Sequence, residues 1–185
     1  MKKLISLLLS LIIVLSLSAC QYSVVVTDEE GNTSTVISNE QEVPANLEGP
    51  YEVDRVVDGD TIIIDLDGVK TRVRFANIDC PESVAPEESG KENTEEGMVA
   101  SEFTKGLLPS GSKVYLEYDV SKTDKYDRTL AYVYLDDGET MIERVLLENG
   151  FARVYNDKNN KKYTDEFYKI QDEAKASKIG IWKDQ

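Results

Sequence analysis

The sequence predicts an α+β domain with a small antiparallel sheet or barrel of five strands, and three observations support this prediction. Runs rich in β-branched residues fill residues 51–75 and return at 113–120 and 129–136. An Asp67-Gly68 pair separates two of these runs, which is a strong hairpin signal. Apolar residues at helical spacing occupy three further stretches, one between the strands and two after them. This grouping of strands and helices is typical of an α+β fold.

The first three strands are predicted from their apolar patterns. Valines recur through the first run, and the second contains three consecutive isoleucines from Ile62 to Ile64. In the third run apolar and basic residues alternate from Thr71 to Phe75, which places Arg74 on the face opposite Val73. This arginine is therefore expected outside the apolar core.

The helix between the strands is predicted at residues 95–108. Val99, Phe103 and Leu107 recur every four residues there, so they form one apolar stripe, which we expect to face the core. A polar loop containing Pro and Glu precedes the helix at about residues 80–93.

Two more helices are predicted after the last strand. Thr140 and Glu143 have the spacing of a capping box, which predicts the start of one helix, and Gly150 stands where that helix should end. Residues 163–178 have a further apolar stripe, and Gly180 is expected to terminate that last helix.

The first twenty residues predict an export signal. Two lysines open the chain, an apolar run covers residues 4–17, and Leu17-Ser18-Ala19-Cys20 follows. The run is shorter than the roughly 20 residues that a membrane-spanning helix needs. The four residues ending in Cys20 resemble a bacterial lipobox, which implies cleavage after residue 19 and lipid attachment at Cys20. The alternative is an ordinary signal peptide in which Cys20 has no role.

Residues 21–50 predict a flexible tether between this anchor and the domain. They include six acidic residues, no basic residue and few apolar residues apart from Val24 to Val26, which could add an edge strand. Such a segment buries too little surface to offset its ordering entropy. The predicted organisation is therefore a lipoprotein signal at 1–19, a lipidated, disordered acidic tether at 20–50, and one domain at 51–185.

Composition excludes much catalytic chemistry. The 185 residues include no His and two Cys, which excludes His-based triads, His-ligated zinc and four-thiolate metal sites. Residues 51–185 contain 19 basic and 29 acidic side chains, a formal charge of −10. Nucleic-acid-binding proteins are usually basic, so this charge predicts weak substrate affinity if the substrate is a nucleic acid.

Three clusters of polar residues nevertheless offer a route to phosphodiester hydrolysis. They are Asp58-Gly59-Asp60-Thr61, Arg74 with Asp79-Cys80-Pro81-Glu82, and Asp124-Lys125-Tyr126-Asp127-Arg128. Taken alone, the first cluster is typical of a turn, Arg74 is compatible with a surface strand residue paired with Glu, and the third cluster is typical of a solvated loop. Together they supply hard oxygens suited to Ca²⁺, a carboxylate base and two guanidinium groups for a phosphate.

Residues 51–185 resemble the thermonuclease family of the staphylococcal nuclease type. The resemblance rests on these three clusters in register, on Asn149-Gly150-Phe151-Ala152-Arg153-Val154, and on Gly180-Ile181-Trp182. It implies a five-stranded OB-type barrel with three helices. It also implies Ca²⁺-dependent cleavage of DNA or RNA at the bond to the 5′ oxygen, which leaves 3′-phosphate products.

The resemblance also implies roles for individual residues. Asp60 and Asp79 would bind Ca²⁺ through their side chains, and Cys80 would bind it through its carbonyl oxygen. Glu82 would be the general base on water, whereas Arg74 and Arg128 would hold the phosphate and stabilise its transition state. The substrate-binding positions would be Lys125, Tyr126 and Tyr155.

Two residues depart from the family pattern. Cys80 replaces the usual Thr, which a carbonyl ligand should tolerate, and Asp127 replaces a Gly before Arg128. Asp tolerates positive φ better than most residues do, but its charge lies near an arginine intended for phosphate.

The sequence therefore predicts a monomeric, extracellular, membrane-anchored Ca²⁺-dependent endonuclease that acts on nucleic acid. Two alternatives remain open. The first is a weakly active or inactive OB-type binding module, and the second is an extracellular Ca²⁺-binding lipoprotein.

Overall fold

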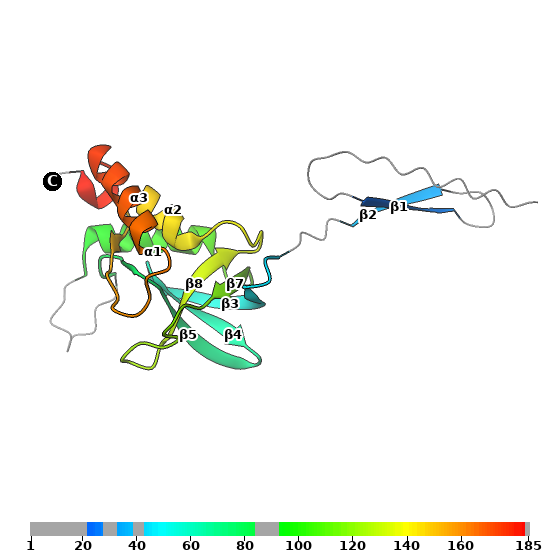
Figure 1. Ribbon diagram of the computed structural model, residues 1–185, viewed down its shortest axis with the longest axis horizontal. Helices are drawn as coiled ribbons and strands as arrows, with labels where there is room; N and C mark the ends of the chain where they lie inside the picture. The colour runs from blue at the N-terminus through cyan, green and yellow to red at the C-terminus, as the bar shows by residue number, and fades with distance from the viewer. Residues whose placement is uncertain (1–21, 28–32, 39–42, 84–92, 184–185) are drawn as a thin grey trace, which may run out of the picture. The chain divides into compact units, whose positions relative to one another are not determined.

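The computed structural model describes residues 22–27, 33–38, 43–83 and 93–183 (Figure 1). The chain divides into two units, one before and one from Val43. In the first unit, β1 (Tyr22–Thr27) pairs antiparallel with β2 (Thr33–Ser38). This hairpin lies in the segment predicted as a tether, where β-branched residues gather in both strands. The predicted signal and Cys20 lie outside the described residues, and within those residues no helix meets the length and apolarity needed to span a bilayer.

The second unit is built on a closed five-stranded barrel with the order β3-β4-β5-β8-β7. Its strands are β3 (Glu48–Asp58), β4 (Thr61–Leu66), β5 (Val69–Phe75), β7 (Lys113–Glu117) and β8 (Thr129–Leu135). Asp67 and Gly68 both take positive φ in the β4–β5 hairpin, as the sequence predicted. The pairing of β5 with β8 is parallel, which requires the long crossover through α1 and β7. The predicted five-stranded barrel is confirmed, with one parallel pair among its antiparallel neighbours.

The unit begins at Val43 rather than at the predicted boundary, Tyr51. Val43 and Leu47 pack against the barrel core, and the Asn46 side-chain amide donates a hydrogen bond to Glu117. Glu117 is 1% exposed and also accepts hydrogen bonds from the hydroxyl groups of Tyr134 and Tyr163. The segment just before the barrel is therefore part of the folded unit.

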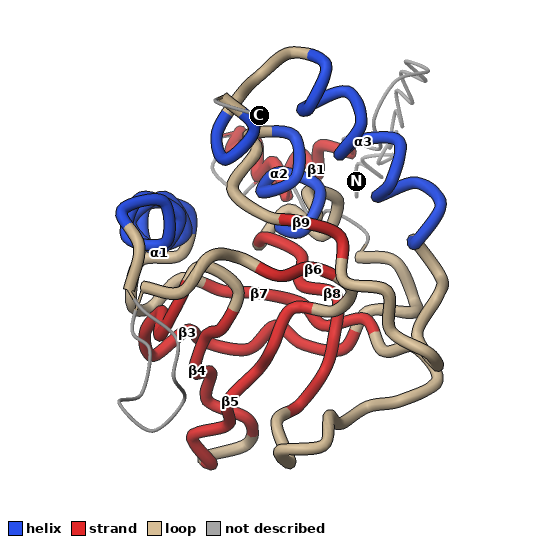
Figure 2. Tube along the Cα trace, turned by 90° about the vertical axis from the view of Figure 1, so that its left-hand side faces the viewer, coloured by secondary structure: helices blue, strands red, loops and turns tan. Residues whose placement is uncertain are grey.

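Within the described residues, three α-helices cover the barrel: α1 (Glu95–Leu107), α2 (Ile142–Glu148) and α3 (Thr164–Ala176). Figure 2 shows α1 at one side of the strands and α2 with α3 together beyond β9. A short pair, β6 (Ile78–Asp79) with β9 (Arg153–Val154), lies between the barrel and these two helices (Figure 2). The three predicted helices are confirmed.

The buried face of α1 differs from the prediction. Its buried residues are the small ones, Gly97, Ala100, Ser101 and Thr104, whereas Val99 is 48% exposed. The reason is close backbone approach: a Cβ on Gly97 would lie 2.2 Å from the Glu82 carbonyl oxygen. Of the stripe that the sequence assigned to the core, Val99 therefore faces outward, whereas Phe103 and Leu107 are partly buried and pack against the core.

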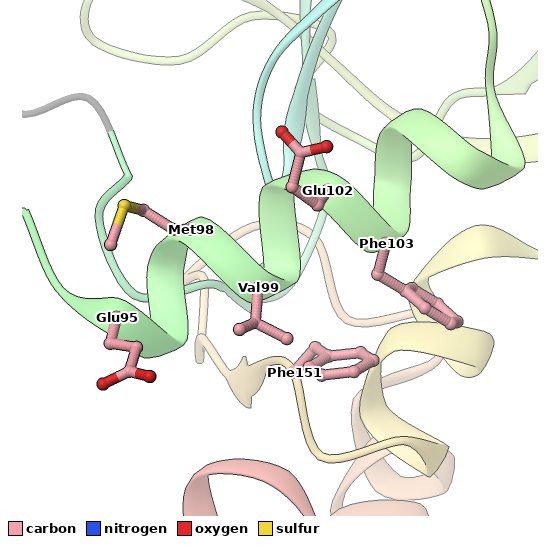
Figure 3. Close-up of a pocket in the computed structure, with 6 residues that line it drawn as sticks. All are labelled: Glu95, Met98, Val99, Glu102, Phe103 and Phe151. Carbon is pink, nitrogen blue, oxygen red and sulfur yellow. The ribbon is translucent and has the colours of Figure 1, made fainter.

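On that outward side, the large side chains line an apolar groove of about 460 Å³. Figure 3 shows Val99 and Phe103 directed towards Phe151, while Glu102 points away from them. The rings of Phe103 and Phe151 lie 4.6 Å apart between centroids. None of the described residues that line the groove is cationic, so this lining is unsuited to a phosphate ligand.

The capping box predicted for the second helix does not form. Thr140 donates its hydroxyl to Asp137, and Glu143 is completely buried and accepts a hydrogen bond from the Val133 N–H, so they form no capping box. Helix α2 has Met141 at its N-cap without a side-chain hydrogen bond.

The last helix ends earlier than predicted. Helix α3 stops before Lys178, which takes positive φ, and Gly180 instead opens a short 3-10 turn (Gly180–Trp182). Gly180 packs so tightly that a Cβ there would lie 2.1 Å from the Gly150 carbonyl oxygen. Gly150 itself follows α2 with positive φ, as predicted.

Candidate active site

The candidate site is built around one arginine that joins two aspartates. Arg74 lies near the end of β5, and its guanidinium pairs with the carboxylates of both Asp60 and Asp79. The Arg74 Nη2–Asp79 Oδ1 distance is 2.7 Å. Asp60 lies in the turn entering β4, opposite this end of β5 in the hairpin register, where Thr61 pairs with Arg74. Alternation along β5 thus places this guanidinium outside the core, next to both acids, as the sequence predicted.

Asp60 is held in place by its backbone surroundings. Its carboxylate is 7% exposed and accepts a hydrogen bond from the Cys80 N–H at 2.7 Å. Burial raises the pKa of the Asp60 carboxyl, whereas the adjacent Arg74 guanidinium acts in the opposite direction. The Asp79 side chain is 52% exposed, so the two carboxylates form a buried end and an open end of one cluster.

Gly59 allows the Cys80 loop to approach β4. A Cβ on Gly59 would lie 2.9 Å from the Cys80 Cβ, so a larger residue would displace the loop. The Thr104 hydroxyl of α1 donates to the Gly59 carbonyl at 2.8 Å and fixes the turn from the other side. The Cys80 thiol is buried and its pKa is raised by burial, which suits a structural role for its sulfur.

Glu82 follows this loop and lies against the start of α1. Its carbonyl oxygen accepts a hydrogen bond from the Thr94 N–H at 2.9 Å. The next residue, Ser83, donates its hydroxyl to Asp58 at 2.6 Å, which ties the loop to the end of β3. Asp58 therefore anchors the segment that carries the predicted base, a role that its turn-like sequence did not reveal.

Asn77 is a second positioning residue that the sequence analysis missed. It takes positive φ between β5 and β6, and its buried amide donates to the Asn160 carbonyl at 2.8 Å. Its side-chain oxygen accepts a hydrogen bond from the Tyr132 hydroxyl at 3.0 Å. These contacts fix the turn between Arg74 and Asp79. Nothing in the sequence near Asn77 marks it, because its partners are distant along the chain.

Arg128 lies in a separate local structure. Its Nε donates to the Asp124 carboxylate at 2.7 Å, and its Nη2 lies 2.6 Å from the same oxygen. The Asp124 pKa is lowered: partial burial raises it, but hydrogen bonds from Arg128 and Tyr126 outweigh that effect. Within the described residues, no hydrogen bond or ion pair joins Arg128 to Asp60 or Asp79.

The strand register nevertheless places the turn that carries Arg128 next to the strand that carries Arg74. Arg74 pairs with Leu130 in the parallel β5–β8 ladder, and Arg128 precedes β8 directly. Asp127 takes a φ of 61°, so this turn requires the left-handed conformation that the sequence anticipated.

The predicted substrate contacts are exposed. Tyr126 is 67% exposed, and the Lys125 Nζ lies 4.8 Å from its ring centroid. Tyr155 is 57% exposed and follows β9, where its N–H donates to the Asn77 carbonyl at 2.8 Å. The first two lie in the Arg128 turn and the third beside the β6–β9 pair, so they border different parts of the candidate site.

The oxygen donors fit a hard cation. Asp60 and Asp79 converge on one guanidinium, and the backbone of Cys80 lies against Asp60. Within the described residues, however, no group of three or more acidic or Cys side chains could hold a metal. A Ca²⁺ ion here would therefore depend on two carboxylates, a backbone carbonyl and water, a donor set that this hard ion accepts.

This fold and site define an OB-type barrel protein with an acid–arginine cluster suited to phosphate chemistry. The chain belongs to the family of staphylococcal nuclease homologues, whose model matches residues 72–184. It is 42% identical over 135 residues to the thermonuclease of Staphylococcus hyicus, covering 73% of this chain and 76% of that protein.

Two further relatives extend this similarity. The thermonuclease of Staphylococcus intermedius is 44% identical over 133 residues, covering 72% of this chain and 76% of that protein. Endonuclease YncB of Bacillus subtilis is 42% identical over 132 residues, covering 70% of this chain and 60% of that protein.

Proposed function

We propose that this chain is a Ca²⁺-dependent nuclease that hydrolyses DNA and RNA to products ending in 3′-phosphates. The observation that supports this proposal best is the convergence of Asp60 and Asp79 on the Arg74 guanidinium. Membership of the staphylococcal nuclease family and the names of the relatives support the same chemistry.

In this proposal the scissile phosphate is bound by Arg74 of β5 and by Arg128 in the turn before β8. Glu82 accepts a proton from a water molecule, whose oxygen attacks phosphorus as the bond to the 5′ oxygen breaks. The leaving 5′ oxygen is protonated from solvent. Charge that develops on the phosphate would be stabilised by the two guanidinium groups.

Asp60, Asp79 and the Cys80 carbonyl would hold the Ca²⁺ ion, which would supply Lewis-acid stabilisation of the same charge. Arg74 pairs with both carboxylates, but its single positive charge balances only one of their two negative charges, so the pair of acids keeps a net negative charge that suits a cation. The nucleotide would be contacted by the ammonium group of Lys125 and by the exposed aromatic rings of Tyr126 and Tyr155.

The test is degradation of DNA in the presence of Ca²⁺ or of a chelator, with Glu82→Gln as the key variant. We expect the chelator to abolish activity and Glu82→Gln to lower it by about 10² to 10⁴-fold. Glu148→Gln, at an exposed position on α2, is the matched control and should keep full activity. Full activity of Glu82→Gln, or in chelator, would contradict the proposal.

Calorimetry separates the alternatives. Ca²⁺ binding that strengthens binding of a short oligonucleotide supports the nuclease. Ca²⁺ binding that is indifferent to the oligonucleotide favours a Ca²⁺-binding lipoprotein, and oligonucleotide binding without Ca²⁺ favours a binding module.

We also propose that the protein is held at the outer face of a bacterial membrane through lipid on Cys20. The support is the sequence of residues 1–20 alone. Replacing Cys20 with Ser should move the protein from the membrane fraction to the soluble fraction, and retention in the membrane would overturn the anchor.

A further inference from the structure

A polar groove of about 360 Å³ opens beside the candidate active site. One wall comes from the catalytic loop and the start of α1, at Pro81 and Thr94. The other wall comes from β9 and the turn after α3, at Arg153 and Lys183. The volume falls within the range of small-ligand pockets, so the groove has room for a nucleotide unit.

The strand register places this groove directly next to the proposed catalytic centre. Asp79 of β6 and Arg153 of β9 are direct partners in an antiparallel pair. Side chains of such partners lie on the same face, with Cβ atoms about 4.5–5.5 Å apart. Pro81 also lies between Cys80 and Glu82 in the chain. A strand bound at Asp79 would therefore meet the groove at its next phosphate.

The groove presents two exposed cations in a strongly acidic domain. In the part of the chain that the structure describes, neither Arg153 nor Lys183 forms an ion pair, even though Arg153 has Asp79 as its register partner. Among the lining residues that the structure describes, Glu96 carries the one acidic group, so the two cations exceed the acid of this lining by one charge.

Arg153 is also held in position by an aromatic ring. Its guanidinium carbon lies 5.3 Å from the ring centroid of Trp182, which is 6% exposed. Lys175 Nζ lies 4.8 Å from the same ring. Stacking of this kind orders an arginine and leaves its N–H groups available to a phosphate.

We propose that this groove is a second phosphate subsite, in which Arg153 and Lys183 bind a backbone phosphate next to the scissile one. The inference rests on the proposed nuclease function and adds a determinant of substrate length. Substrates long enough to reach the groove gain binding energy there, whereas a minimal substrate with one phosphodiester does not.

The test compares two substrates for the double variant Arg153→Gln/Lys183→Gln. The long substrate is single-stranded DNA of about 12 nucleotides, which matches the site size of OB-type folds. The minimal substrate is a nitrophenyl ester of thymidine 5′-phosphate without a 3′-phosphate, so that the scissile phosphodiester is its one phosphate. We expect KM for the long substrate to rise about tenfold and KM for the minimal substrate to stay unchanged. Lys183→Gln alone avoids loss of the Trp182 stack and should raise KM for the long substrate by a smaller factor.

Lys169→Gln is the matched control, because Lys169 is an exposed lysine of α3 outside the groove. An unchanged KM for the long substrate, an equal rise for the minimal one, or an equal rise in the Lys169 variant would overturn the subsite. If the parent protein cleaves neither substrate, the nuclease proposal fails instead. Anisotropy of the fluorescein-labelled oligonucleotide then tests the groove alone: binding that the double variant loses supports a phosphate site, and unchanged binding rejects it.

Discussion

The two arginines of the candidate site are held in opposite ways. The Arg74 side chain is 12% exposed and joins acids that are 14 and 5 residues away on other elements, so global folding positions it. The Arg128 side chain is 28% exposed and pairs with Asp124 inside one turn. The comparison teaches that half of the site is part of the barrel, whereas the other half is a local loop structure attached to it.

The largest expected effect comes from removing each arginine in turn. Arg74→Ala leaves the buried Asp60 without its partner, so the free energy of unfolding should fall by about 3–5 kcal/mol. Arg128→Ala removes a partly solvated pair, so we expect a loss of only about 0–1 kcal/mol. Denaturant unfolding measures both. Equal losses of stability would contradict the distinction between a global and a local half.

The activities of the two variants sharpen the same comparison. Both arginines are proposed to stabilise the phosphate, so both variants should lose about 10²-fold or more in kcat. The Arg128→Ala protein, which remains folded, gives the cleaner measurement. Normal activity in that variant would show that Arg128 serves only in its ion pair with Asp124 and does not act on the substrate.

A comparable effect on stability, which depends on pH, is expected at Glu143 of α2. Its fully buried carboxylate accepts the Val133 N–H of β8 at 3.1 Å. Burial raises the Glu143 pKa from its ordinary value of 4.5 to about 8. Because the folded protein holds this proton more tightly, stability from this group is full below about pH 4.5 and is lost as the pH rises through 8.

The variant Glu143→Gln should remove that pH dependence. At roughly 1.4 kcal/mol per pKa unit, the parent protein should lose several kcal/mol between pH 5 and pH 9 relative to the variant. Glu148→Gln on the same helix is exposed and should retain the slope of the parent. Parallel stability curves for parent and Glu143→Gln would show that the buried carboxyl does not titrate in this range.

The smallest effect is expected at Asp127 in the local half. Its charge lies next to Arg128 in sequence, and a unit charge nearby is worth about 1 kcal/mol in water. Asp127→Asn should therefore raise kcat/KM several-fold at most. Asp127→Gly removes the same charge and also suits the φ of 61°, so any further gain reports backbone strain. Unchanged or lower activity in both variants would show that the carboxylate does not oppose substrate binding.

Much of this fold was predictable because its signals are local. The Asp67-Gly68 turn, the alternation that turns Arg74 out of the core, and Gly150 after α2 are each decided by neighbouring residues. The wrong predictions concern partners that are distant in sequence. Glu143 has capping-box spacing, but a backbone N–H of β8 takes its carboxylate.

The same division applies to the candidate site. Residue types and spacing indicated the Asp60, Asp79 and Arg74 cluster, which the structure brings together. Asn77 and Arg153 were not predicted as site residues, because one depends on Asn160 and the other on pairing with Asp79 across the chain. Sequence pattern finds groups that do chemistry more readily than groups that position them.

The small-residue face of α1 has a consequence for how this domain can diverge. Gly97 has no space to enlarge, because the backbone of Pro81 and Glu82 lies against it, and Ala100 and Thr104 are fully buried beside Gly59. Substitutions in this helix should therefore accumulate on its other side, which carries Met98, Val99 and Phe103. Homologous chains should keep one side of the helix almost fixed while the other side changes freely.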